Sequence, residues 1–331
     1  MNQTAKKVRA LGLCSGGLDS ILSALVLRKQ GIDVEWVSFD TPFFPAIKAR
    51  KASQLNNVPL RVEKITEDYI EMLKNPNCGY GQHMNPCLDC HALMFKKAGQ
   101  IMQKEGFDFL FSGEVLGQRP MSQTKPSLRY VEKHSGFDGY ILRPLSAKKL
   151  PETIPEQQGL VDRSRLLDIA GRGRKRQIAL AKEFGVTEYP APAGGCLLTD
   201  KDYSARLRDL FKHQSAYTED ELNLLKYGRY FRLNAETRLI VGRTQQENDA
   251  ILKHHDGFSD VVLKTLKYPG PTSLLPREAG PEMITLAASI CAGYSKAPPD
   301  LPVEVRITGG DGESTVTVIP IPPAEVSHFL I

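Results

Sequence analysis

The sequence contains little that would place it in a membrane or outside the cell. No apolar run approaches the roughly 20 residues that a transmembrane helix needs, and the opening residues MNQTAKKVRALGLC lack the apolar core of a secretory signal peptide. Only six cysteines occur in 331 residues, and their grouping does not suggest the disulfide framework of a small secreted domain. We therefore expect a cytoplasmic protein with no membrane contact.

The length and the pattern of the chain predict two domains joined by a connecting region. A chain of 331 residues is too long for one compact core. Strand-like runs alternate with helical patterns over residues 1–150, which predicts an α/β domain with a doubly wound, mostly parallel sheet. Residues 151–200 form the connecting region, with a basic helix near 172–185. Residues 201–331 predict a smaller α+β domain, in which a helical segment precedes several short strands.

A short turn after the first expected strand is suited to binding an anion. Residues 15–20 read SGGLDS, and a glycine-rich turn that enters a helix directs backbone N–H groups and the helix dipole at a ligand. No lysine follows the glycines, so this is not the GxxxxGK[ST] loop. Ligands of parallel sheets bind at the carboxyl ends of the strands, where the pattern also places Asp40–Thr41 and Gly113–Glu114.

SGGLDS resembles the SGGxDS PP-loop of the ATP-pyrophosphatase superfamily, whose HUP-like domains cleave ATP between the α- and β-phosphates and adenylate a substrate. The segment SGEVLGQRPMSQT (112–124) is similar to a segment of tRNA 4-thiouridine synthetases. The resemblance implies ATP and Mg²⁺ as cofactors and Asp19 as a catalytic residue. The cofactor-binding residues that we expect from the turn, the strand ends and the resemblance are Ser15, Gly16, Gly17, Asp19, Ser20, Asp40, Gly113 and Gln118.

Two cysteine motifs distinguish the chain from other PP-loop enzymes. NPCLDC (85–90) resembles the Asn-Pro-Cys-x-x-Cys motif of tRNA 2-thiouridylases, and APAGGC (191–196) resembles their second-cysteine loop. The resemblance implies that Cys90 and Cys196 are catalytic. Cys87, Cys90 and Cys196 together supply three thiolates, enough for a [4Fe–4S] cluster with one open iron. Persulfide or disulfide chemistry, a structural zinc site and inert thiols remain open alternatives.

Two further segments suggest RNA binding. Basic residues cluster between 163 and 185, and we expect phosphate contacts from Arg172, Arg174, Lys175 and Arg176. A solvated basic helix is the alternative interpretation. Residues 229–254 resemble the RNA-binding module of NFACT proteins, a match to which Arg243 contributes.

Taken together, these resemblances imply an ATP-dependent tRNA sulfurtransferase, a thiouridine synthase. It would adenylate a uridine carbonyl oxygen, release pyrophosphate and replace the oxygen with sulfur. The implied partners are tRNA and a sulfur donor, either sulfide or a cysteine desulfurase, and a homodimer is compatible with the sequence. Two alternatives stay open: a PP-loop ligase that acts on a small non-RNA substrate, and a non-catalytic RNA-binding quality-control factor.

Overall fold

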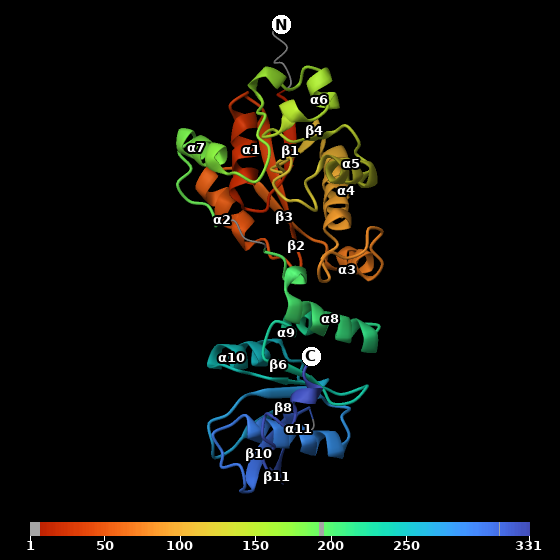
Figure 1. Ribbon diagram of the computed structural model, residues 1–331, viewed down its shortest axis with the longest axis vertical. Helices are drawn as coiled ribbons and strands as arrows, with labels where there is room; N and C mark the ends of the chain where they lie inside the picture. The colour runs from red at the N-terminus through yellow and green to blue at the C-terminus, as the bar shows by residue number, and fades with distance from the viewer. Residues whose placement is uncertain (1–6, 192–194, 311) are drawn as a thin grey trace. The chain divides into compact units, whose positions relative to one another are not determined.

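The computed structural model describes residues 7–191, 195–310 and 312–331. The chain divides into two units, Met1–Thr199 and Asp200–Ile331 (Figure 1). Residues 192–194 of the predicted second-cysteine loop lie outside the described residues, whereas Gly195 and Cys196 are described. Within these described ranges, no helix combines the length and apolar character that crossing a membrane would require.

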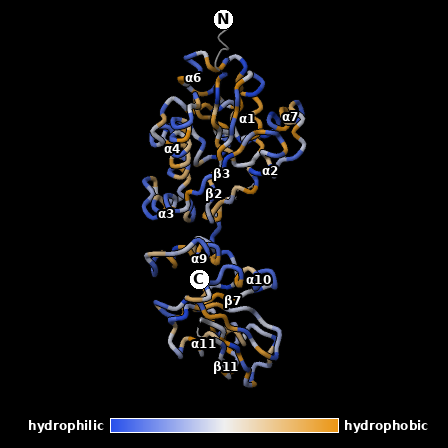
Figure 2. Tube along the Cα trace, turned by 180° about the vertical axis from the view of Figure 1, so that it is seen from behind, coloured by the Kyte–Doolittle hydropathy of each residue, from blue (hydrophilic) through white to orange (hydrophobic). Residues whose placement is uncertain are grey.

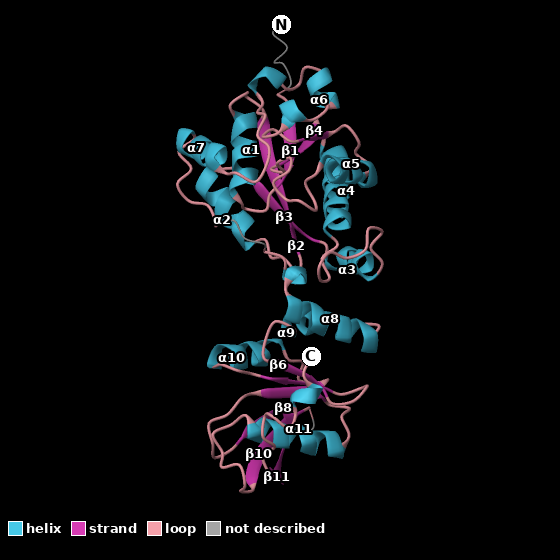
Figure 3. Ribbon diagram, in the orientation of Figure 1, coloured by secondary structure: helices cyan, strands magenta, loops and turns pink. Residues whose placement is uncertain are grey.

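The first unit is built on a five-stranded sheet with the order β3-β2-β1-β4-β5, in which every neighbouring pair is parallel. Helices α1, α2 and α7 lie on one side of this sheet, and α4 and α5 lie on the other (Figures 1 and 3). The predicted doubly wound α/β fold is therefore confirmed. The strands are β1 (Arg9–Leu13), β2 (Asp33–Asp40), β3 (Leu60–Lys64), β4 (Phe109–Ser112) and β5 (Ile141–Leu142).

The helices of the first unit follow the strands in the usual alternation. They are α1 (Leu18–Arg28), α2 (Ile47–Asn56), α3 (Thr66–Lys74), α4 (Cys87–Glu105), α5 (Lys125–Ser135), α6 (Ile154–Gln157) and α7 (Lys175–Glu183). Apolar side chains of β1, β2 and β4 pack between the helical layers, and the one tryptophan of the chain, Trp36 in β2, is fully buried. Figure 2 shows apolar residues along the sheets of both units. Burial of this apolar surface is the main favourable contribution to folding.

The strand order reverses direction between β1 and β4. The chain runs from β1 outward to β2 and β3 and then crosses to β4 on the other side of β1. In open parallel sheets, ligands bind outside the carboxyl ends of the strands at such a reversal. Gly113, just after β4, lies against the start of α1, where an added Cβ would be 2.4 Å from the backbone nitrogen of Ser20. Glycine is therefore needed at position 113 to let the two loops meet.

The second unit contains a six-stranded sheet with the order β11-β10-β8-β9-β7-β6, and its neighbouring strands pair antiparallel. Helix α11 packs against this sheet, and its Ile290 and Cys291 are fully buried in the core. The predicted smaller α+β domain is confirmed. The elements are α8 (Lys201–His213), α9 (Glu219–Leu224), β6 (Arg229–Arg232), β7 (Arg238–Val241), α10 (Gln245–His254), β8 (Asp260–Thr265), β9 (Ser273–Pro276), α11 (Pro281–Gly293), β10 (Val303–Gly309) and β11 (Gly312–Val318).

Candidate functional site

The SGGLDS turn connects β1 to α1 and leaves the start of that helix open. Gly16 has a φ of +73°, and an added Cβ would lie 2.3 Å from the carbonyl carbon of Lys48, so this position requires glycine. Gly17 is the N-cap of α1, and no side chain caps the helix. The Ser20 hydroxyl donates to the Gly17 carbonyl oxygen at 2.7 Å. The first N–H groups of α1 therefore have no side-chain cap and can serve an anion.

Asp19 lies in the first turn of α1 and is held by two glutamines. Gln118, from the loop after β4, donates its Nε2 hydrogen to Asp19 Oδ2 at 2.6 Å. Gln177, from α7, donates its Nε2 hydrogen to Gln118 Oε1 at 3.0 Å. Three segments that are far apart in the sequence therefore meet at one carboxylate.

Several polar atoms around Asp19 are buried without a partner. In the described part of the chain these are Asp19 Oδ1, Gln177 Oε1 and Arg174 Nε. Burial raises the pKa of Asp19, while Gln118, Arg174 and Gln177 act in the opposite direction. Buried polar groups rarely lack partners, so these atoms indicate room for a ligand or for water.

Other predicted cofactor-binding residues lie at the carboxyl edge of the same sheet with different local roles. Ser15 is exposed at the tip of the turn, and its Oγ accepts a long hydrogen bond of 3.4 Å from the Gly17 N–H. Asp40 ends β2, and its Oδ1 accepts from the Ala46 N–H at 2.7 Å. One oxygen of Asp40 therefore shapes the loop that follows β2.

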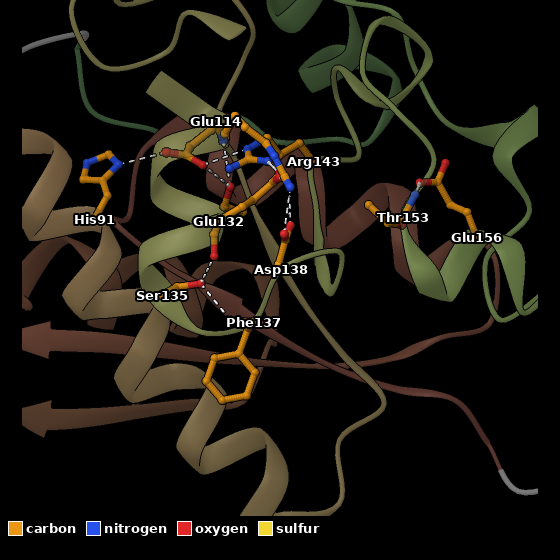
Figure 4. A network of polar contacts seen from close by, with 11 residues as sticks. His91, Glu114, Glu132, Ser135, Phe137, Asp138, Arg143, Thr153 and Glu156 are labelled. Carbon is orange, nitrogen blue, oxygen red and sulfur yellow. Dashed lines mark hydrogen bonds and ion pairs between the residues drawn. The ribbon is translucent and has the colours of Figure 1, made fainter. Parts of the chain in front are cut away.

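A buried ion-pair network below the loop after β4 was missed by sequence reasoning. Glu114 Oε1 is 2.8 Å from His91 Nδ1 in α4, and Glu114 Oε2 accepts from Arg143 Nε at 2.9 Å (Figure 4). Arg143 also pairs with Glu132 of α5. Burial alone would raise the pKa of Glu114, but Arg143 and His91 outweigh it and lower the pKa to about 2. Nothing in the local pattern of SGEVLG predicts this network, because its partners come from other elements.

The three cysteines of the predicted sulfur site come together at the carboxyl edge of the sheet. Cys87 and Cys90 lie in the first turn of α4, and Cys196 precedes a short 3₁₀ turn. The Leu197 N–H donates to the Phe43 carbonyl at 3.0 Å, and the Met84 N–H donates to the Leu198 carbonyl at 3.2 Å. These two backbone bonds hold the loop of Cys196 beside the start of α4.

Electrostatic coupling supports the proximity of these thiols. Burial raises the pKa of Cys90, and Cys196 and Cys87 raise it further, while a hydrogen bond from Tyr69 acts to lower it. Burial and, to a lesser extent, Cys87 raise the pKa of Cys196 to about 11. Tyr69 of α3 is a second residue that sequence reasoning missed, because only the folded chain brings α3 to the cysteines.

As the side chains stand, no group of three or more His, Cys, Asp or Glu residues within 7–191, 195–310 and 312–331 is arranged to hold a metal ion. Of the remaining cysteines, Cys78 lies in the loop before α4, where its backbone N–H donates to Asp89 Oδ2 at 2.8 Å. Cys14 and Cys291 are buried, and Cys78 is exposed. The three candidate thiols are thus near one another without forming a ready-made metal site.

The predicted basic segment has two distinct faces. Arg172, Lys175 and Arg176 are exposed, and Arg176 pairs with Asp168 at 2.7 Å. Arg174 is half-buried and lies near Asp19. Three of the four predicted phosphate contacts therefore face solvent, whereas the fourth faces the PP-loop.

Arg243 of the second unit lies at the start of α10. Its guanidinium pairs with Glu247 and its backbone N–H donates to Glu247 Oε2 at 2.9 Å. Asn248 Oδ1 accepts from the Thr272 N–H at 2.9 Å, so Asn248 fixes the backbone beside Arg243. The Arg243 side chain is 46% exposed and can reach a partner outside the unit.

Comparison with known proteins supports both resemblances. Residues 5–154 match the family model described as thiamine biosynthesis protein (ThiI), and residues 228–330 match the NFACT protein RNA binding domain. A tRNA-specific 2-thiouridylase MnmA 2 of Thermoanaerobacter sp. (strain X514) is 26% identical over 235 residues, which cover 62% of this chain and 59% of the relative. A probable tRNA sulfurtransferase of Acholeplasma laidlawii is 30% identical over 149 residues, 41% of this chain and 34% of the relative.

A solved 4-thiouridine synthetase–RNA complex with bound ATP aligns with a TM-score of 0.40 and 18% identity, covering 66% of this chain and 52% of that one. This alignment is too loose to assign residues. The chain spans about three fifths of the 2-thiouridylase and about a third of the probable sulfurtransferase. The predicted resemblance to PP-loop tRNA thiouridine synthetases and to the NFACT RNA-binding module is confirmed.

The Glu114 network predicts a pH-dependent loss of stability. Glu114→Gln removes a buried charge that faces Arg143, and we expect the free energy of unfolding to fall by about 3 kcal/mol. The folded pKa of about 2 lies below the usual value near 4.3. The stabilisation is therefore present at neutral pH and is lost as the pH falls towards 2.

Urea unfolding followed by the fluorescence of Trp36 measures this difference at each pH. The difference between wild type and Glu114→Gln should shrink from about pH 5 downward. The exposed Glu71→Gln on α3 is the control and should change stability by less than about 0.5 kcal/mol. An equal difference at pH 3 and pH 7 would show that the charge of Glu114 is not what stabilises the unit.

Proposed function

We propose that the protein is an ATP-dependent tRNA sulfurtransferase. The observation that carries this proposal is the placement of two sets of groups at the carboxyl edge of one sheet: the open start of α1 with Asp19, and the three thiols of Cys87, Cys90 and Cys196. The first set is suited to binding the phosphates of ATP, and the second set is suited to holding a sulfur atom. The matches to the ThiI family model and to the NFACT RNA-binding domain support RNA as the substrate.

The first step is activation of a uridine carbonyl oxygen. That oxygen attacks the α-phosphorus of ATP, the bond from the α-phosphorus to the bridging oxygen breaks, and pyrophosphate leaves with the electron pair. The N–H groups at the start of α1 stabilise the charge that develops on the phosphates. Asp19 is suited to hold Mg²⁺-bound water beside them, because its Oδ1 has no partner within the described chain.

The second step replaces the activated oxygen. A hydrosulfide attacks the ring carbon, the carbon–oxygen bond to the adenylate breaks, and AMP leaves with its oxygen. The thiols of Cys90 and Cys196 are buried or half-buried, so sulfur held there is protected from solvent. Tyr69 lies against Cys90 and can orient its sulfur atom.

The three thiols fit an iron–sulfur cluster in number and chemistry, since three thiolates can hold a [4Fe–4S] group. Such a cluster, when bound, would leave one iron without a protein ligand, where exogenous sulfide could be held. Cys87, Cys90 and Cys196 are its proposed ligands. A persulfide on Cys90 or Cys196 is the second candidate, favoured by the lack of a ready-made metal site among the described residues.

The basic residues are proposed to bind the RNA backbone. Arg172, Lys175 and Arg176 are exposed on and beside α7, and Arg243 is half-exposed on the second unit. Arginine and lysine contacts to phosphates supply affinity without sequence preference. Selection of the uridine then depends on how the RNA presents it.

Asp19→Asn tests the activation step. The substitution keeps the shape of the side chain and removes its charge, and we expect tRNA-dependent release of pyrophosphate to fall about a hundredfold. Asp33→Asn, at an exposed residue at the start of β2, is the matched control and should retain the wild-type rate. A rate for Asp19→Asn within about twofold of wild type would contradict a role for this carboxylate.

Cys90→Ser and Cys196→Ser separate the two steps. Either substitution should lower the rate of thiouridine formation by more than about a thousandfold. Pyrophosphate should still be released in the presence of tRNA. The exposed Cys78→Ser serves as the control. If thiouridine still forms in both variants, the sulfur site lies elsewhere.

Anaerobic purification tests the cluster. The protein should be brown, contain iron and show broad absorption in the blue region, and Cys87→Ser should lose both iron and colour. A colourless protein that still thiolates tRNA would exclude the cluster and favour the persulfide.

A further inference from the structure

Helix α7 carries polar groups on two opposite faces. Gln177 is completely buried and Arg174, the N-cap residue one turn earlier, is half-buried near Asp19. Residues three apart lie on the same face of a helix, which accounts for this pair. Lys175 and Arg176 point outward into solvent.

The buried face continues into the PP-loop through hydrogen bonds. Gln177 donates to Gln118 Oε1, and Gln118 in turn donates to Asp19 Oδ2. A glutamine amide has one acceptor end and one donor end. By binding the acceptor end of Gln118, Gln177 fixes the donor end towards Asp19. Gln177 therefore acts on the carboxylate through Gln118.

The segment that leads into α7 is also tied to the loop that carries Gln118. Leu116 pairs with Ala170 as a parallel bridge, and the Gly171 N–H donates to the Leu116 carbonyl at 2.7 Å. At its other end α7 packs on α1, where Lys29 pairs with Glu183 at 2.7 Å. A shift of α7 would thus move both the loop after β4, which carries Gln118, and helix α1, which carries Asp19.

We propose that Gln177 is a positioning residue that couples RNA contact on the outward face of α7 to the orientation of Asp19, so that bound RNA accelerates cleavage of ATP. This inference rests on the proposed function. The unpartnered Asp19 Oδ1, Gln177 Oε1 and Arg174 Nε support it, because a network that the protein alone does not saturate has freedom to change arrangement. Thermodynamic linkage requires the reciprocal effect: nucleotide must then strengthen RNA binding.

Gln177→Met tests the coupling, because methionine preserves length and flexibility but neither donates nor accepts well. The first readout is the ratio of AMP formation with saturating tRNA to AMP formation without it. The second is the Kd for tRNA with and without a non-hydrolysable ATP analogue and Mg²⁺. In wild type, tRNA should raise AMP formation and the analogue should lower the Kd for tRNA. Gln103→Met, at an exposed position on α4, is the control.

In Gln177→Met we expect the ratio to fall about tenfold and the effect of the analogue on the Kd to disappear, with the Kd for tRNA alone within about twofold of wild type. If the variant does not fold, Gln177→Asn, which withdraws the amide by one methylene, should show the same losses. A wild-type ratio in a folded variant overturns the coupling and leaves the proposed function intact. If wild type itself makes no more AMP with tRNA than without, the proposed function and the coupling both fail.

Discussion

The first unit depends on the carboxylate of Asp19, which is partly buried in the first turn of α1, just beyond the central strand β1. Removing a carboxylate from water is unfavourable unless hydrogen bonds compensate, and Gln118 donates such a bond to Asp19 Oδ2. Gln118 is itself held by Gln177, so the loop after β4 and helix α7 have to pack where they do. Gly113 permits this approach, because any side chain there would collide with the start of α1. The connecting region is thus a structural part of the proposed nucleotide site.

The proposed sulfur site depends on a second long-range assembly. Cys196 is separated from Cys87 and Cys90 by about a hundred residues of sequence, and two backbone hydrogen bonds hold its loop near them. Helix α1 begins at the carboxyl edge because it follows β1, and α4 begins near that edge because it leads back to the start of β4. The sheet topology therefore places the proposed activating site and the proposed thiol site at the same edge of one sheet.

Much of the fold could be predicted because its signals are local. The run DVEWVSFD (33–40) predicts a strand and the pattern from about Cys87 to Glu105 predicts a long helix, and β2 and α4 have these bounds. Helix α5 was missed, although Thr124 as its N-cap and the proline in its first turn are recognisable signals. The PP-loop glycines were recognisable from sequence for the same reason. Gln177, Glu114 and Tyr69 were not, because each acquires its role only from residues that the fold brings to it.

The most direct test of the account is mass spectrometry of the nucleosides in tRNA after incubation with the purified protein, ATP, Mg²⁺ and sulfide. An ATP-dependent tRNA sulfurtransferase should form a uridine in which one oxygen has been exchanged for sulfur. One AMP should form for each exchange, and no thiolated uridine should form without ATP. Formation of AMP with no thiolated nucleoside, under conditions in which the cysteines are reduced and any iron is retained, would contradict the account.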